Sequence, residues 1–199
     1  AYYLRTGGSK VAWMEYVSFE VNPKNGVIKN LVTDIRVFDT ETGQEWHVEN
    51  NRGTEWDRLA VSDRWVVYEE VREGYCPNIV FDYVVHDLWE YELATERLIK
   101  VAESDLLENS VGPARVSGDR VVIVKGFPGY CVDVLHENQF WQYDLATGES
   151  KFLRKPGIGL SMMPDTEDWE KVMELEWPWL VARTSGSITA WNFESGDAI

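Results

Sequence analysis

The side chains of this chain that are best suited to catalysis are two histidine–acid pairs, His86-Asp87 and His136-Glu137. An imidazole beside a carboxylate is a combination that general acid–base catalysis uses. Adjacent residues of a β-strand point to opposite faces, however, so neither pair forms a dyad by itself. The sequence contains no Gly-x-Ser-x-Gly elbow, Walker loop, His-Glu-x-x-His motif or dinucleotide fingerprint. We therefore assign no catalytic residue from the sequence.

The two cysteines occur in the same three-residue motif, at Gly74-Tyr75-Cys76 and Gly129-Tyr130-Cys131. If the two loops emerge from neighbouring repeats, the glycines allow close backbone approach, and a Cys76–Cys131 disulfide is predicted. The bridge would enclose about 55 residues, for which the chain-entropy model gives on the order of 4 kcal/mol. It would place the protein in an oxidising compartment, whereas two reduced cysteines inherited from a duplicated repeat would suit the cytosol.

The segments around the cysteines are rich in rings that stack on sugars or anchor a protein partner, and we interpret residues 17–33 as the equivalent loop of the first repeat. Loops on a rigid scaffold are the usual location of recognition residues. The alternative is that these loops cover the ends of the repeats or pair as extra strands, and Asn22-Pro23-Lys24-Asn25-Gly26 is typical of a hairpin tip. The predicted ligand- or partner-binding residues are Tyr75, Phe81, Tyr83, His86, Phe127, Tyr130 and His136.

An acidic stretch, residues 165–170, offers carboxylate oxygens of Asp165, Glu167 and Asp168 to a calcium ion. It lacks the glycine and the terminal glutamate spacing of an EF-hand loop, so we interpret it as a solvated connector. Zinc is disfavoured because the chain has three histidines and none stands at a paired cysteine spacing. No cofactor is expected, with calcium as the alternative.

The elements that must position these residues are set by an internal repeat of about 50 residues, a period typical of propellers and arrays. In each repeat an aromatic residue is followed by a turn residue and a Thr-Gly-like pair. The four copies are Phe38-Asp39-Thr40-Glu41-Thr42-Gly43, Tyr91-Glu92-Leu93-Ala94-Thr95-Glu96, Tyr143-Asp144-Leu145-Ala146-Thr147-Gly148 and Trp191-Asn192-Phe193-Glu194-Ser195-Gly196. Such a turn supplies the side-chain hydrogen bond and the positive φ that a hairpin needs.

Hydrophobic runs precede each aromatic turn, and half-exposed alternating runs follow the first three. The predicted buried strands are residues 10–14, 64–68, 120–124 and 179–182, and the predicted outer strands are residues 44–48, 97–101 and 150–153, with a first strand at residues 1–5. A four-stranded unit of this kind must stack on its neighbours to bury its faces.

These units predict an all-β fold, a β-propeller of about four four-stranded antiparallel blades in a single domain. The expected blades are residues 1–54, 55–109, 110–165 and 166–199, the last of them incomplete. We favour part of a larger propeller over a self-contained ring of four.

Two phrases of the third repeat, residues 116–122 (Val-Ser-Gly-Asp-Arg-Val-Val) and 140–149 (Phe-Trp-Gln-Tyr-Asp-Leu-Ala-Thr-Gly-Glu), resemble the TolB-like β-propeller repeats of bacterial periplasmic and archaeal cell-surface proteins. The resemblance implies an antiparallel propeller and an exported setting, but no particular reaction. The chain departs from the usual repeat in its longer second-to-third-strand connections and its lack of a Ser-Pro-Asp-Gly turn. By similarity to propeller lyases that act on acidic sugars, His86 and His136 would share a site with Asp82 and Asp133.

The net charge of −15, with 34 acidic against 19 basic residues, excludes a nucleic-acid partner, and no apolar run is long enough for membrane insertion. The sequence therefore predicts a non-catalytic extracellular, cell-surface or periplasmic module for protein–protein assembly, self-assembly, or surface or glycan recognition. The alternative is a propeller enzyme, either polysaccharide lyase-like or the gating domain of a peptidase.

Overall fold

The computed structural model describes residues 4–21, 23, 28–49, 59–74, 83–102, 115–125, 139–154, 173–184, 187–195 and 197, and these residues form strands and turns. None of the secondary structure within those ranges is a helix with the length and apolar character to cross a membrane.

Within these ranges, fifteen strands form separate antiparallel sheets in which sequence neighbours pair. The first sheet contains β1 (Leu4–Gly7), β2 (Lys10–Val21), β3 (Ile28–Asp39) and β4 (Glu45–Val48). The second contains β5 (Leu59–Val61), β6 (Trp65–Gly74), β7 (Tyr83–Glu92) and β8 (Arg97–Ala102). The third contains β9 (Arg115–Ser117), β10 (Arg120–Lys125), β11 (Gln139–Asp144) and β12 (Ser150–Arg154). The fourth contains β13 (Met173–Glu176), β14 (Trp179–Thr184) and β15 (Ser187–Asn192).

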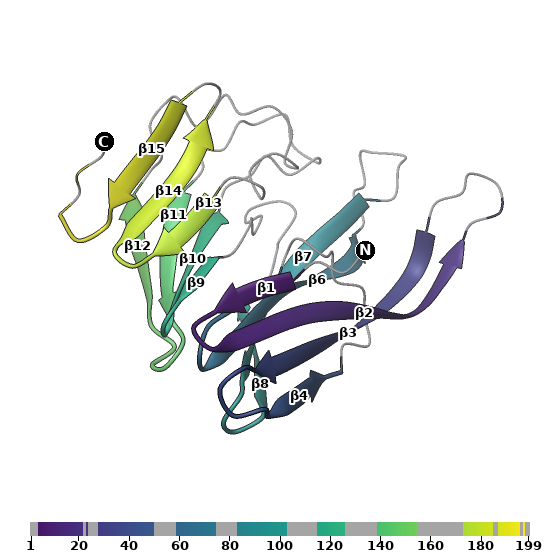
Figure 1. The fold of residues 1–199 in the computed structure, drawn as a ribbon. Helices are drawn as coiled ribbons and strands as arrows, with labels where there is room; N and C mark the ends of the chain where they lie inside the picture. Colours follow the sequence, from purple (N-terminus) through teal and green to yellow (C-terminus); the bar gives the residue numbers. More distant parts are fainter. Residues whose placement is uncertain are drawn as a thin grey trace.

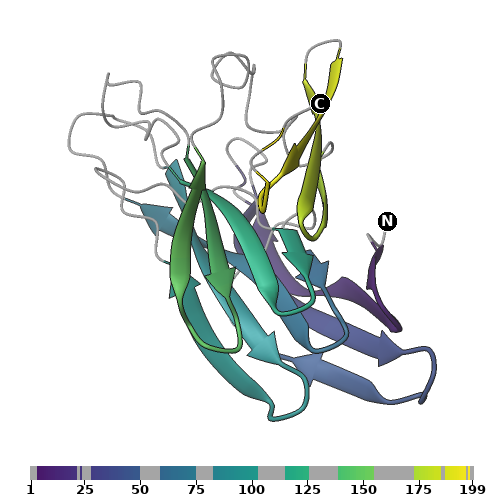
Figure 2. The same cartoon turned by 90° about the vertical axis from the view of Figure 1, so that its left-hand side faces the viewer.

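The sheets follow one another in chain order, with the first and fourth at the two ends of an array that does not close within the described residues (Figure 1). The first strands of the sheets are neighbours: β5 contacts β1 and β9, and β9 contacts β13. Figure 2 shows the β3–β4, β7–β8 and β11–β12 turns gathered at one end of the first three sheets, the lower edge in that view. This arrangement confirms the predicted all-β, propeller-type fold with an incomplete blade set.

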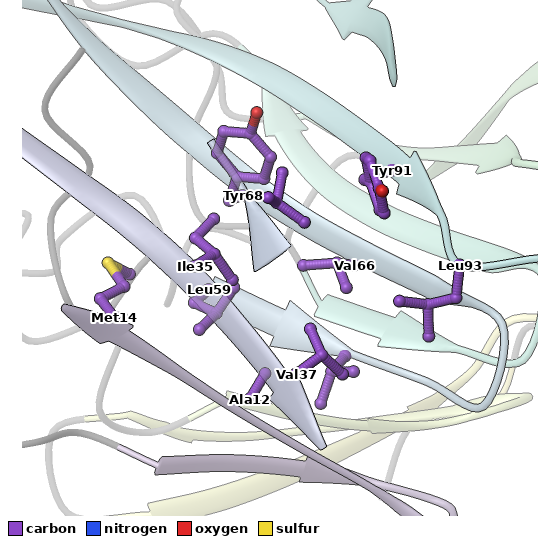
Figure 3. Close-up of a cluster of buried hydrophobic side chains, with 11 residues drawn as sticks. Ala12, Met14, Ile35, Val37, Leu59, Val66, Tyr68, Tyr91 and Leu93 are labelled. Carbon is purple, nitrogen blue, oxygen red and sulfur yellow. The ribbon is translucent and has the colours of Figure 1, made fainter. Parts of the chain in front are cut away.

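Strand β6 is buried on both faces because a sheet lies on each side of it. Val66 and Tyr68 belong to a core shared with the first sheet, most of which is drawn in Figure 3. Trp65 and Val67 point the other way, into a core shared with the third sheet. A strand covered on both sides needs apolar residues at every position, which explains the continuous run in the sequence.

The repeated turns are structural, as the sequence indicates. The Asp39 carboxylate accepts hydrogen bonds from the backbone N–H groups of Glu41 and Thr42 at 2.9 and 3.4 Å. Asn192 plays the same part in the fourth sheet, with bonds of 2.9 and 3.0 Å. Gly43 and Gly148 adopt φ of 76° and 75° beyond two of these turns, and Glu96 takes φ of 55° at the equivalent place without a glycine.

The middle strands run further than the sequence predicted. Residues 17–33 include the ends of β2 and β3, which stay paired as far as Val21 and Ile28. Strands β6 and β7 pair as far as Gly74 and Tyr83. The interpretation of 17–33 as a loop is therefore wrong, and the alternative of additional strand pairing is confirmed for the first repeat. The predicted hairpin tip at residues 22–26 lies, except for Pro23, outside the described residues.

Candidate interaction surface

The extended middle strands of the first two sheets form two-stranded ribbons that project beyond their neighbours. Strands β2 and β3 have 12 residues each, whereas β1 and β4 have 4 each. Strands β6 and β7 have 10 residues each, against 3 in β5 and 6 in β8. Figure 1 shows the far parts of β2 and β3 reaching past β1 and β4. The flanking strands β1, β4, β5 and β8 pair with only part of each ribbon.

The first ribbon exposes two large apolar side chains near its base. Tyr16 is 55% exposed and Val17 is 57% exposed. They lie at a break in strand register, because Tyr16 pairs with Thr33 but the next paired residue, Ser18, lies opposite Val32. A β-bulge inserts an extra residue and re-aims the neighbouring side chains, and bulges are common beside functional sites. The bulge accounts for two successive exposed apolar residues on one strand.

Two of the predicted binding residues, Tyr83 and His86, lie on β7 in the second ribbon, opposite Gly74 and Val71. The structure thus brings them onto the same kind of projecting element as Tyr16 and Val17. The remaining predicted residues lie outside the described ranges, so the disulfide, the aromatic loop tips and the calcium alternative stay predictions. They are Tyr75, Cys76, Phe81, Phe127, Tyr130, Cys131, His136, Asp165, Glu167 and Asp168.

The acid next to His86 has a structural role in the described structure. Asp87 is fully buried, and its carboxylate accepts a 3.0 Å hydrogen bond from Lys100 Nζ. Lys100 also lies over the ring of Trp89, 5.1 Å from the ring centroid. An ion pair that is buried on its acidic side resists disruption, because removing the lysine would leave an uncompensated charge.

Sequence reasoning missed a concentration of buried acids in the second sheet, comprising Glu69, Glu70, Asp87, Glu90 and Glu92. Burial raises the pKa of Glu90 to about 7, and the charge of Glu92 adds to the rise while Arg97 opposes it. Hydrogen bonds from Thr95 and then from Arg64 hold the pKa of Glu92 below its usual value. The available signal was the acidic pair Glu69-Glu70, which directly follows the predicted buried strand of residues 64–68. Within the described residues, no group of three histidine, cysteine or acidic side chains is arranged to hold a metal ion.

A second polar network lies on the outer face of the first sheet. Arg36 Nε donates to Glu15 at 3.1 Å, and Trp13 Nε1 donates to the same carboxylate at 3.2 Å. These bonds, the one from Trp13 first, lower the pKa of Glu15. His47 Nε2 lies 2.6 Å from Asp34 Oδ2 on the neighbouring strand. Nothing in the local sequence singles out His47, because its partner comes from another strand.

No protein-family model and no curated protein matches the chain. Solved structures do match. The β-propeller domain of the trilobed protease from Pyrococcus furiosus aligns over 100% of this chain and 56% of its own, with 17% identity and a TM-score of 0.51. Oligogalacturonate lyase from Vibrio parahaemolyticus aligns over 98% of this chain and 52% of its own, with 12% identity and a TM-score of 0.59. TolB from Acinetobacter baumannii aligns over 98% of this chain and 41% of its own, with 15% identity and a TM-score of 0.56.

These likenesses show the fold: the chain has a β-propeller architecture that resembles TolB at the level of the fold. The chain spans about half the length of the first two structures it resembles. Because the similar structures include TolB, a lyase and a protease domain, the fold leaves the reaction class open.

Proposed function

We propose that this protein is a non-catalytic extracellular or periplasmic propeller module that recognises a protein or glycan partner through its projecting ribbons and their aromatic residues. The observation that carries the proposal is the exposure of Tyr16 and Val17 at a bulge on the first ribbon. Tyrosine suits this role, because its ring buries a large apolar area while its hydroxyl stays hydrogen-bonded.

The roles of two described carboxylates support a binding module. Asp87, the acid beside His86, pairs with Lys100, and Glu92 pairs with Arg64 and Thr95. A carboxylate held by two structural donors is a poor general base, because each donor lowers its proton affinity. The resemblance to exported TolB-like repeats and the predicted disulfide support the extracellular or periplasmic setting. No cofactor is part of the proposal, and a calcium ion at the acidic stretch is its one optional addition.

The competing proposal is a propeller enzyme, lyase-like or peptidase-associated, with His86 and His136 as its reactive residues. Its support is that the similar structures include an oligogalacturonate lyase and an acylaminoacyl peptidase. It differs from the binding proposal in a measurable way, since it requires turnover that depends on both histidines.

The test compares the purified protein with a Tyr16→Ser/Val17→Ser variant and a matched Leu98→Ser control, in which an apolar residue that is 44% exposed is changed on β8. Binding to a glycan array that includes oligogalacturonate and to isolated cell-envelope fractions would be measured, together with oligogalacturonate cleavage. We expect envelope or glycan binding by the wild type and the control, at least tenfold weaker binding by the double variant, and no cleavage.

Two outcomes would overturn the proposal. One is the absence of binding to both the array and the envelope fraction. The other is cleavage of oligogalacturonate that disappears in a His86→Ala/His136→Ala variant whose circular dichroism spectrum is unchanged, which would establish the enzyme instead.

A further inference from the structure

Glu90 is a carboxylate placed at the packed junction between the second and third sheets. On β7 it lies two residues from Leu88, and therefore on the face whose core joins Leu88 to Val121 of the third sheet. It lies opposite Val67 on β6 and opposite Ile99 on β8. Only 5% of Glu90 is exposed. The carboxylate thus stands where the packing of two sheets favours an apolar side chain.

The equivalent position in the other described sheets carries no charge. Strand register aligns Glu90 with Val37 in the first sheet, Gln142 in the third and Ala190 in the fourth, because each pairs with the third residue of the strand before it. Val37 is fully buried in the core between the first and second sheets. The fold therefore does not require an acid here, and its presence is particular to the second sheet.

The surroundings of Glu90 disfavour its ionised form. The titratable or charged groups on the elements packed around it are Glu69 on β6, Glu92 on β7, Arg97 on β8, and Asp119 and Tyr143 of the third sheet. Arg64 is engaged by Glu92, at 2.8 Å from its Nε, and by Asp119, at 3.5 Å from its Nη1. Among the described residues, none donates a hydrogen bond to the Glu90 carboxylate. Burial therefore raises the pKa of Glu90 to about 7, which Arg97 opposes and Glu92 reinforces.

Strand β8 lies over Glu90 as the outer strand of the second sheet, and its first half is held by few buried contacts. It pairs with β7 alone in the described sheet. Of residues 97–99, only Ile99 is half-buried and the other two are exposed. Further along the strand, Lys100 Nζ lies 3.0 Å from the buried carboxylate of Asp87. Segments with few buried contacts are the first to open locally, so residues 97–99 are the part of β8 that can separate.

We propose that Glu90 is a proton switch for this edge of the second sheet: residues 97–99 stay docked on β7 while its carboxyl is protonated, and they detach when it ionises. An ionised carboxylate in an apolar junction needs water if it has no hydrogen-bonding partner, and moving the strand opposite it admits water directly. The Lys100–Asp87 pair holds the rest of β8 in place, so the opening stays local. The switch gives the rim of the molecule two states, independent of which partner the protein binds.

The direction of the switch follows from proton linkage. The docked state holds the Glu90 proton more tightly than a state in which the carboxyl is hydrated, because the pKa of the docked group is raised from 4.5 to about 7. Docking of residues 97–99 is therefore strongest below about pH 4.5 and weakens as pH rises to about 7, beyond which it changes no further.

The test is amide hydrogen exchange of the whole protein between pH 5 and pH 8, with each rate divided by that of an unstructured chain at the same pH. Residues 150–152 are the internal control, because β12 is the equivalent outer strand of the third sheet and lies opposite the uncharged Gln142. We expect the protection of residues 97–99 to fall at least tenfold from pH 5 to pH 8, and that of residues 150–152 to stay constant. A carboxylate fully hydrated on opening sets an upper limit of roughly 70-fold.

Three variants assign the response to Glu90. Glu90→Gln keeps the size of the side chain without its titration, and Glu90→Val introduces the residue that the first sheet has at Val37. Both should protect residues 97–99 equally at pH 5 and pH 8. Glu149→Gln, which removes an exposed carboxylate beside β12, is the matched control and should keep the wild-type response. Circular dichroism spectra at both pH values establish that each variant is folded.

Three results would overturn the proposal. The first is equal protection of residues 97–99 at pH 5 and pH 8 in the wild type. The second is a pH response that persists in a folded Glu90→Gln or Glu90→Val variant. The third is an equal loss of protection at residues 150–152, because the opening would then involve whole sheets rather than one strand edge.

Discussion

Truncating Leu88 to alanine tests directly whether the second and third sheets pack as described. Leu88 lies on β7, is fully buried, and belongs to the core that Trp65 and Val67 share with Val121 and Ile123 of the third sheet. The neighbouring residue on the same strand, Trp89, belongs to the opposite core. The substitution therefore makes a cavity at the junction between the second and third sheets and nowhere else.

The expected cost follows from the burial. Leu-to-Ala changes at fully buried sites cost about 2.7–5.0 kcal/mol, the transfer free energy of the lost methyl groups plus a cavity contribution. We expect about 3 kcal/mol, at the lower part of this range, because short strands at a sheet-to-sheet junction can partly relax into the space. For a protein of this size each kcal/mol lowers Tm by roughly 2–4 °C, so Tm should fall by about 6–12 °C.

The assay is urea unfolding monitored by the fluorescence of the ten tryptophans, with thermal melts in parallel. Leu98→Ala is the matched control, because that leucine is exposed on β8 and its truncation should cost less than about 0.5 kcal/mol. A Leu88→Ala variant within about 1 kcal/mol of the wild type would refute the burial of Leu88 between the second and third sheets. Equal losses for Leu88→Ala and Leu98→Ala would refute it as well.

Three further predictions concern single positions. Glu96 holds a left-handed φ of 55° that costs an L-residue roughly 1 kcal/mol, so Glu96→Gly should raise the urea midpoint and Gly148→Ala, at φ of 75°, should lower it. The pKa of Glu90 is raised to about 7 from 4.5. As pH rises, the unfolded chain therefore releases this proton before the folded protein does, so the free energy of unfolding should fall between about pH 4.5 and 7 and then level off. Urea titrations at a series of pH values measure this, and Glu90→Gln should lack the pH dependence. Asp119 accepts a 2.6 Å hydrogen bond from Trp65 Nε1–H across the junction between the second and third sheets. Asp119→Ala should therefore lower the free energy of unfolding by about 1 kcal/mol in chemical unfolding. Asp119→Asn keeps an acceptor and should lower it less.

A pH-independent unfolding free energy for the wild type between pH 4.5 and 8 would contradict the environment assigned to Glu90. An unchanged midpoint in Glu96→Gly would show that the turn tolerates a side chain without strain.

The sequence predicts only part of the candidate site. The ring chemistry of Tyr83 and His86 predicts them as binding residues, and the structure places both on a projecting ribbon. Tyr16 and Val17 were not singled out individually, because an alternating strand pattern does not reveal where flanking strands stop. His47 was missed because its partner, Asp34, is brought next to it only by the pairing of β3 with β4.

The sequence by itself determined the repeat, the strand order within each sheet and the turns, because these depend on residues close together in the chain. The bonds from Asp39 and Asn192 to backbone groups two and three residues ahead need nothing from elsewhere in the fold. The tertiary structure alone decided how far β2 and β6 extend and which acids are buried. Those features depend on which sheet stands on each side of a strand, and that is fixed by packing between segments some 50 residues apart, which local patterns do not encode.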